Sequence, residues 1–499
     1  MLTGPIKDEQ GLEQGGLPSS DCYKLYNNKL LDQAQQSSLG VELSKDLIVS
    51  AVGQADDTAL LSDDLLKLLL ILQLALDYCE KYNVELSPSK TKLMQIVPPR
   101  KSTFVPYNPI KMFNKCIDFI EQSEHVGVLR SSDGNLPNLL QMFASFKKAL
   151  GSIISCGLAR RSRSNPSASL RILSLYGTPV LMSGLASLVL SPKEISSVDQ
   201  QFKRRVQALL KLSISSPAPL VHFVSGTLPG TAILHLRQLS LFGMICHLPG
   251  DPLHHQAQHV LLTSSSLGNS WFIQVRKLFL QYSLPHPLLF LSNPPQKEVF
   301  KKLVKSKVTD YWENKLRMEA SFLPSLEYFH PEFMSLSIPH KLLTSAGSKS
   351  YEVAKARIQL LFLANQYPSS KNTRHWSTQN PDGLCSFPVC QEQKLVESSE
   401  HILLCCTAYS LEREKLYSMC LGVRNPYTYQ LITRILFSRS PNKMMQFLVD
   451  SSALPEVIHA VQLYGESILK DLFYLSRTWC FSLHRLRMRR LGKWNFRWQ

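Results

Sequence analysis

The sequence has no long apolar run and no sign of a secretory leader. Its most apolar stretch covers only residues 65–76 and is interrupted by Lys67 and Gln73, whereas a membrane-spanning helix needs about 20 apolar residues. Residues 1–30 are largely polar and lack the apolar core of a signal peptide. We therefore expect no membrane partner, and an intracellular location, nuclear or cytoplasmic, instead of secretion.

The sequence also gives no sign of a disulfide framework or of internal repeats. The eleven cysteines are scattered without regular spacing, and an odd number of this kind does not suggest a disulfide framework. Thiols that stay free fit a reducing compartment. No segment repeats itself, which argues against a repeat architecture.

Acidic residues are scarce. The 38 Asp and Glu stand against 55 Lys and Arg, which gives a formal net charge of +17. Residues 1–100 are the exception, with nine basic and 14 acidic residues. A basic body joined to an acidic segment suggests a polyanionic partner, with the acids kept for metal, although charge that serves only solubility is the alternative. The 499 residues suffice for about two to four domains, and 44% of them are hydrophobic, enough for sizeable cores.

The clearest local pattern is an Asp-Asp pair between two short apolar runs. Residues 47–52 have strand character and end at a glycine, and a second apolar run follows at 58–61. We expect a β-hairpin with Asp56 and Asp57 at its tip, where carboxylates could bind Mg²⁺. A plain turn is the alternative, because Asp is common in turns.

The neighbouring segments predict helices and one further strand. One helix is expected over residues 19–37, and another runs to about residue 81 with Ser62 as its cap. Residues 124–129 have the composition of a strand. Residues 135–245 read as mostly helical and basic, and helices separated by Pro and Ser follow over 250–345.

Five segments occur in an order known from one protein family. They are Glu-Gln-Gly-Gly-Leu-Pro-Ser-Ser at 13–20, Gln-Ala-Asp-Asp at 54–57, Leu-Ser-Pro-Ser-Lys-Thr at 86–91, His-Val-Gly-Val at 125–128 and Leu-Tyr-Gly-Thr-Pro-Val-Leu at 175–181. The series resembles the reverse transcriptase of non-LTR (LINE-type) retrotransposons, from the palm into the thumb. The resemblance covers nearly the whole chain, and its most specific parts are residues 13–130 and 385–413.

The resemblance implies an α+β fold: a partial right-hand polymerase palm of β-hairpin and helices, then a mainly α-helical thumb and C-terminal region with a small zinc knuckle. The expected segments are a partial palm at 1–132, a helical thumb-like region at 133–248, a helical linker region at 249–365, a zinc-knuckle-like module at 366–415, and C-terminal helices with a basic aromatic tail at 416–499.

The resemblance also implies an RNA-directed DNA polymerase that uses two-metal nucleotidyl transfer. Its partners would be an RNA template, a DNA primer and deoxynucleoside triphosphates. Asp56 would be the main magnesium ligand and Asp57 an auxiliary carboxylate. Lys90 would protonate or neutralise the leaving pyrophosphate, or it is simply a solvated turn lysine. Gln14 and Gly15 would border the incoming nucleotide.

The chain departs from the family in its catalytic set. The family's first catalytic aspartate lies on a strand before the Gln-Gly turn, and only twelve residues precede Glu13 here. Gln54 replaces an aromatic residue and Glu13 replaces an arginine. We therefore expect the C-terminal part of such an enzyme, weakly active or inactive alone and without a recognisable endonuclease. A non-catalytic nucleic-acid-binding protein derived from a retroelement is the alternative.

A group of soft ligands follows the helical regions. The candidate zinc ligands are Cys385, Cys390, His401 and either Cys405 or Cys406. Four such ligands suit a structural, tetrahedral Zn²⁺ site. The family's knuckle has a Glu before the His and a four-residue gap after it, which favours Cys406. Buried cysteine pairs beside a core histidine are the alternative.

Basic clusters are the candidate contacts for nucleic acid. They are Arg160, Arg161 and Arg163, then Lys203, Arg204 and Arg205, and in the tail Arg487, Arg489 and Arg490. Basic side chains neutralise phosphates, and the Trp and Phe residues between the tail arginines could stack on bases. Packing of those aromatics against the body is the alternative.

Overall fold

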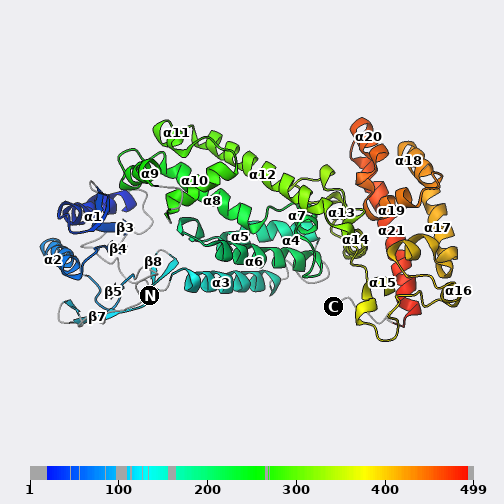
Figure 1. Ribbon diagram of the computed structural model, residues 1–499, viewed down its shortest axis with the longest axis horizontal. Helices are drawn as coiled ribbons and strands as arrows, with labels where there is room; N and C mark the ends of the chain where they lie inside the picture. Colours follow the sequence, from blue (N-terminus) through cyan, green and yellow to red (C-terminus); the bar gives the residue numbers. More distant parts are fainter. Residues whose placement is uncertain are drawn as a thin grey trace, which may run out of the picture. The chain divides into compact units, whose positions relative to one another are not determined.

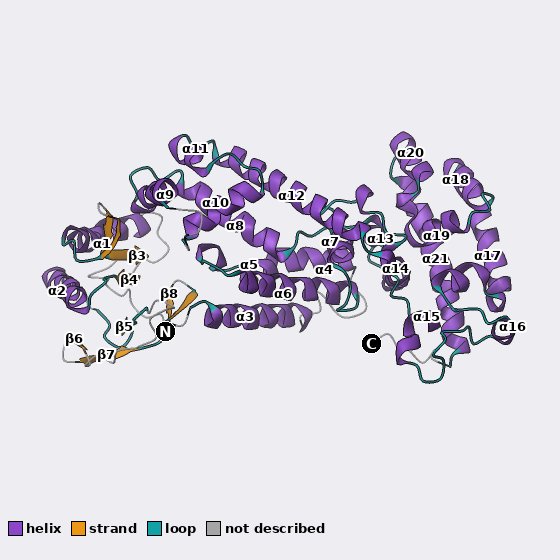
Figure 2. Cartoon of the chain, viewed as in Figure 1, coloured by secondary structure: helices purple, strands orange, loops and turns teal. Residues whose placement is uncertain are grey.

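The computed structural model describes residues 19–44, 47–54, 57–84, 86–96, 110–112, 115–125, 127–132, 134–155, 165–264, 268 and 270–492. Within these residues the protein is mixed α+β and mostly helical, with small sheets (Figure 2). The expected α+β class is confirmed at this level.

The strands are short and all lie in the first third of the chain as described. They are β1 (Val41–Ser44), β2 (Leu47–Val49), β3 (Ala51–Gln54), β4 (Asp57–Leu60), β5 (Lys92–Leu93), β6 (Ile110–Met112), β7 (Lys115–Phe119), β8 (Gln122–His125) and β9 (Val128–Ser131). β1 pairs with β2, β3 with β4, and β8 with β9, while β7 lies between β5 and β6. Only the β5–β7 pairing is parallel.

Helices make up most of the remainder (Figure 1). They are α1 (Ser19–Gln36), α2 (Leu65–Tyr82), α3 (Leu136–Ser155), α4 (Pro166–Ile172), α5 (Thr178–Leu181), α6 (Pro192–Leu210), α7 (Ala218–Ser225), α8 (Gly230–Ile245), α9 (Pro252–Thr263), α10 (Trp271–Gln281), α11 (Pro287–Ser292), α12 (Lys297–Ser321), α13 (Lys341–Thr344), α14 (Ser350–Leu363), α15 (Ser370–Thr373), α16 (Pro388–Glu392), α17 (Ser410–Leu421), α18 (Pro426–Leu436), α19 (Pro441–Asp450), α20 (Pro455–Tyr464) and α21 (Ser467–Arg490). Many begin at a proline, because proline has no N–H to lose at the first helical position.

The expected hairpin is present as β3 and β4. Gln54 pairs with Asp57 and Ala51 pairs with Leu60. Gly53 does not end a strand as expected; it pairs with Thr58 inside the ribbon. The apolar run at 47–52 is divided between β2 and β3.

The cap of α2 differs from the expectation. Asp64, and not Ser62, accepts hydrogen bonds from the backbone N–H groups of Leu66 (2.8 Å) and Lys67 (3.2 Å). The Ser62 hydroxyl instead donates to the carbonyl of Leu39 (2.8 Å). Both residue types cap well, and the tertiary contact of Ser62 decides which one does so here.

The strand expected at 124–129 is a hairpin. β8 and β9 pair with each other, and His125 is the partner of Val128. Gly127, between them, has φ +71°. Glycine adopts this left-handed conformation without a Cβ clash, so the glycine reverses the chain where a strand was expected to continue.

The chain forms two compact units. One contains residues 1–141, 184–189 and 238–303, and the other contains residues 142–183, 190–237 and 304–499. These units are discontinuous in sequence, whereas the division into five consecutive segments remains a prediction. None of the described helices is long and apolar enough to cross a membrane.

Each unit has its own apolar core. In the first unit α1 packs on α2 through Leu30, Ala75, Tyr78 and Cys79. In the second unit α21 lies against α14, α17, α18, α19 and α20. Its fully buried side chains include Trp479 and Phe473, so the last described helix is the centre of that core.

A glycine substitution tests a close approach in the second unit. Gly226 ends α7 with φ +64°, and a Cβ there would overlap the backbone of Ile338 and Pro339. Gly347 has nearly the same φ, +63°, with nothing near a Cβ. We expect Gly226→Ala to lower the free energy of unfolding by about 1–3 kcal/mol more than Gly347→Ala.

Urea denaturation of the two variants beside the parent measures this difference. The left-handed strain, about 1–2 kcal/mol, is common to both variants, so their difference isolates the backbone overlap. Equal losses of stability would show that the approach of residues 338–339 to α7 is looser than described.

Candidate metal centre

Four soft ligands converge in the second unit. Cys385, Cys390, His401 and Cys406 are all buried, and their ligand atoms all lie within 4.8 Å of one another. The Cys406 sulfur is 3.8 Å from that of Cys385 and 3.9 Å from that of Cys390. Zn–S bonds of about 2.3 Å in a tetrahedral site place sulfurs about 3.8 Å apart. The spacing is therefore that of a shared metal, and it is far from the length of a disulfide.

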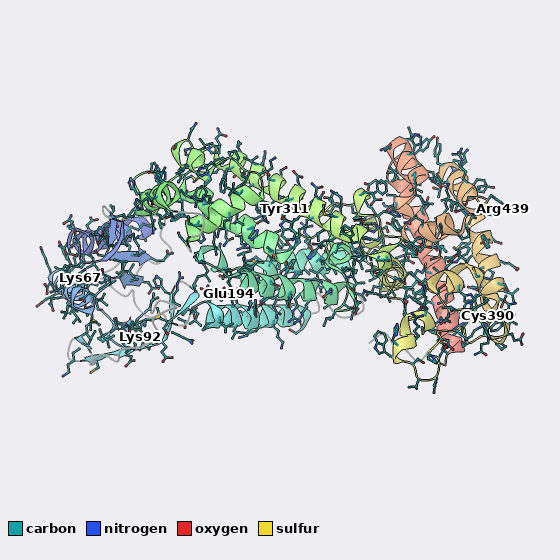
Figure 3. All side chains as sticks on the ribbon, viewed as in Figure 1. Lys67, Lys92, Glu194, Tyr311, Cys390 and Arg439 are labelled. Atoms are coloured by element: carbon teal, nitrogen blue, oxygen red, sulfur yellow. The ribbon has the colours of Figure 1, made fainter. Side chains whose placement is uncertain are left out.

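The first two ligands come from a tight loop. The backbone N–H of Cys385 donates to the carbonyl of Leu395 (2.9 Å), and the N–H of Leu395 donates to the carbonyl of Cys390 (2.9 Å). Leu384 and Val396 form an isolated antiparallel bridge. Cys390 lies on the short helix α16 (Figure 3). The loop thus folds back on itself and brings Cys385 and Cys390 into the same group of potential ligands.

The other two ligands flank a π-helical turn, His401–Cys405. The N–H of Cys406 donates to the carbonyl of His401 at 2.7 Å. An i→i+5 hydrogen bond of this kind widens the helical turn. It explains how two ligands separated by four residues can reach the same metal.

The structure distinguishes the two candidate thiols. Cys405 is exposed, whereas Cys406 is buried with the other ligands. Cys406 is therefore the fourth member of the group, as the sequence favoured. We use the name knuckle for residues 383–409, which hold this group.

The chemistry of the four groups fits a metal ion such as zinc. Nε2 of His401 is buried and has no hydrogen-bond partner, although a buried polar atom normally has one. A hydrogen bond from Cys406 lowers the pKa of the Cys385 thiol to about 4 and raises the pKa of Cys406. The lowered pKa of Cys385 favours its thiolate, which is the form of cysteine that ligates metal. A bound ion would supply a structural cross-link, since no ligand position is left open.

A buried ion pair anchors the knuckle to α21. Arg487 donates two hydrogen bonds to Glu397, from Nε at 3.0 Å and from a terminal nitrogen at 2.8 Å. Glu397 also accepts from the N–H and hydroxyl of Ser370, at 2.8 and 2.7 Å. Glu397 and Arg487 are 3% and 5% exposed.

This geometry corrects one sequence-based prediction. Arg487 was expected to contact nucleic acid, but its guanidinium is committed to Glu397 in the protein interior. Arg490 lies over the rings of Phe387 and Tyr409, at 5.3 and 5.4 Å, although it remains exposed, as does Arg489. Part of the basic helix therefore secures the knuckle.

The remaining basic candidates are placed unevenly. Arg160, Arg161 and Arg163 lie outside the described residues. On α6, Arg204 is exposed, whereas Lys203 and Arg205 are half-buried. Arg204 is therefore the most exposed member of this cluster on α6.

The polymerase candidates are described only in part. Gln14, Gly15 and Asp56 lie outside the described residues, while Asp57 is exposed in β4 and Lys90 is exposed in a turn. The Cys/His cluster is the one group of three or more potential metal ligands found among the described residues. The magnesium site thus remains a prediction.

Two features of the centre escaped the sequence. The sequence analysis did not single out Glu397, and no residue pattern indicated the π-helical turn at His401–Cys405. The only available signal for the ion pair was the spacing of four along Trp479, Leu483 and Arg487, all of which are buried.

No protein-family model matches the chain, and no curated protein matches it.

Proposed function

We propose that the chain is a reverse transcriptase-like protein of the LINE type, which acts on RNA and DNA. The observation that carries the proposal is the knuckle: Glu400 precedes His401, a four-residue gap follows, and Cys406 converges with the other ligands. This is the spacing of the family's knuckle. The β3–β4 hairpin, in which Gln54 and Asp57 form the residue pair nearest the tip, supports the same proposal.

In this proposal the first unit contributes the catalytic acids. Asp56 and Asp57 would bind magnesium beside the reacting phosphate, where metal stabilises the attacking and leaving oxygens. Lys90 would neutralise the pyrophosphate, and Gln14 and Gly15 would border the nucleotide. The knuckle would be structural.

A second candidate function is nucleic-acid binding without catalysis. It is favoured by the excess of basic residues, 55 Lys and Arg against 38 Asp and Glu. Two-metal catalysis needs several carboxylates, whereas binding needs only the basic surface.

Primer extension on an RNA template with Mg²⁺ tests the proposal. The purified chain is compared with Asp56→Ala and with Asp21→Ala, which removes an exposed acid on α1 that pairs with Lys24. We expect all three proteins to bind RNA with strong salt dependence, and any extension to require Asp56.

The outcomes separate the two candidates. Extension by the parent and by Asp21→Ala, but not by Asp56→Ala, supports the polymerase. RNA binding without extension by any of the three supports the non-catalytic protein. Absence of salt-dependent RNA binding overturns both.

A further inference from the structure

An exposed tryptophan stands just before the knuckle. Trp376 ends a short 3₁₀ helix, Arg374–Trp376, and its side chain is 84% exposed, the highest value among the described large hydrophobic residues. Tryptophan is on average highly buried in folded proteins. An indole left in solvent at this level is a candidate contact for a partner.

Basic residues predominate in the segment that carries the indole. Lys371, Arg374 and His375 are exposed in the same segment. Over residues 370–382 the one acid is Asp382, which is exposed six residues after Trp376. The indole therefore lies in a locally basic stretch, which would repel a basic partner and attract an anionic one.

The segment is held firmly although its tip is exposed. Ser369 caps α15 by accepting from the N–H of Asn372 (3.3 Å), and the Asn372 amide donates to the carbonyls of Asn365 (3.0 Å) and Tyr367 (2.9 Å). Ser370 is bound by Glu397, which Arg487 fixes in turn. The indole is thus presented from an ordered base, which lowers the entropic cost of binding.

A close backbone contact holds the same segment against the knuckle. The N–H of Lys371 donates to the carbonyl of Glu397 (3.2 Å), and a Cβ on Gly383 would lie 3.0 Å from the Cα of Lys371. Figure 1 shows α15 and α16 beside the C-terminal half of α21. The knuckle and the segment therefore form one surface of the second unit.

We propose that Trp376, Lys371 and Arg374 form a binding surface for single-stranded nucleic acid. An unpaired base stacks on the indole, and the two cations neutralise adjacent phosphates. The charge pattern favours this partner over a protein, because a purely apolar contact would not need the exposed cations Lys371 and Arg374 in the same segment. The inference rests on the proposed nucleic-acid function and names the side chains that perform the binding.

The test measures the affinity of the full chain for a labelled oligouridylate RNA at several salt concentrations. We expect Trp376→Ala to weaken binding about tenfold or more, since base stacking contributes that much in related sites. Trp376→Phe should retain most of the affinity because it keeps a stacking ring. Phe322→Ala is the matched control, since Phe322 is an aromatic residue that is 77% exposed in the same unit.

The cations have a separate readout. For single strands the slope of log K against log salt changes by about 0.7 for each phosphate contact. Lys371→Ala combined with Arg374→Ala should therefore flatten the slope by about 1.4, while Trp376→Ala leaves the slope nearly unchanged. Thermal melting of each variant checks that the fold is intact.

Each outcome decides the inference. Unchanged affinity in Trp376→Ala, while the parent binds RNA, overturns this surface and leaves the proposed function standing. Loss of self-association in Trp376→Ala with unchanged RNA affinity overturns it in favour of a contact between two copies of the chain. Failure of the parent to bind RNA overturns the proposed function as well.

Discussion

Chelation of the metal should unfold the knuckle and leave the rest of the second unit folded. Structural zinc sites contribute about 10–16 kcal/mol of apparent binding free energy in small peptides, against a total stability of about 5–15 kcal/mol for a typical domain. The ligands Cys385, Cys390, His401 and Cys406 join the loop at 383–396 to the π-helical turn, so a bound ion closes the knuckle on itself. Without the ion, Nε2 of His401 stays buried and unpaired, which costs further stability.

Elemental analysis and hydrogen exchange measure this result. We expect one zinc per chain, and rapid exchange over residues 383–409 once the metal is removed, with α14 and α19 still protected. Cys406→Ser should behave as the chelated protein does. Cys405→Ser is the matched control on the adjacent residue, and it should keep both the zinc and the protection. A fully protected knuckle in metal-free Cys406→Ser would refute a structural metal.

Breaking the buried pair between Glu397 and Arg487 should destabilise the second unit by about 3–5 kcal/mol, because one charge is then left buried without a partner. Arg487→Met and Glu397→Gln are the two variants. The exposed pair Lys443–Glu456 (3.3 Å) is the control, and Lys443→Met should cost about 0–1 kcal/mol.

Urea denaturation of the zinc-loaded proteins, followed by far-UV circular dichroism, compares these variants. The double variant of Glu397 and Arg487 should lose less free energy of unfolding than the two single variants lose in sum. The second substitution removes the charge that the first one left buried without a partner. A cost for Arg487→Met no greater than that for Lys443→Met would show that the pair adds nothing.

The same pair predicts how stability depends on pH. Burial alone would raise the pKa of Glu397, but the hydrogen bonds and charge of Arg487 hold that pKa below its ordinary value. A carboxyl with a lowered folded-state pKa stabilises the fold above its unfolded pKa, about 4.3, and this contribution is lost as the pH falls through the folded-state value. The difference between the parent and Glu397→Gln should therefore be constant near neutral pH and shrink below about pH 4.

Local patterns predicted the helices and the ligand group well. α1 and α2 follow from apolar periodicity, and the β3–β4 hairpin from two short apolar runs. The four ligands were found because short, regular gaps between Cys and His are rare without a metal. Each of these signals lies within about twenty residues of sequence, where spacing alone constrains geometry.

Features that depend on distant residues were not predictable in the same way. Arg487 looked like part of a basic tail, yet its partner Glu397 lies 90 residues earlier. The turn at Gly127 was read as a continuing strand, because valines on both sides have strand character. A tertiary contact determines the position of Arg487, whereas the left-handed conformation of a single glycine determines the turn at Gly127.

The central position of α21 has a consequence for the order in which the protein is made. The α14 side chain of Gln359 donates to Ser476 on α21, 117 residues later, and Lys355 donates to Thr478 across 123 residues. During synthesis α14, α17, α18 and α19 leave the ribosome before the helix that covers them. Their apolar faces stay open until residues 467–490 have been made, so a chain that stops before residue 467 exposes that core to chaperones and proteases.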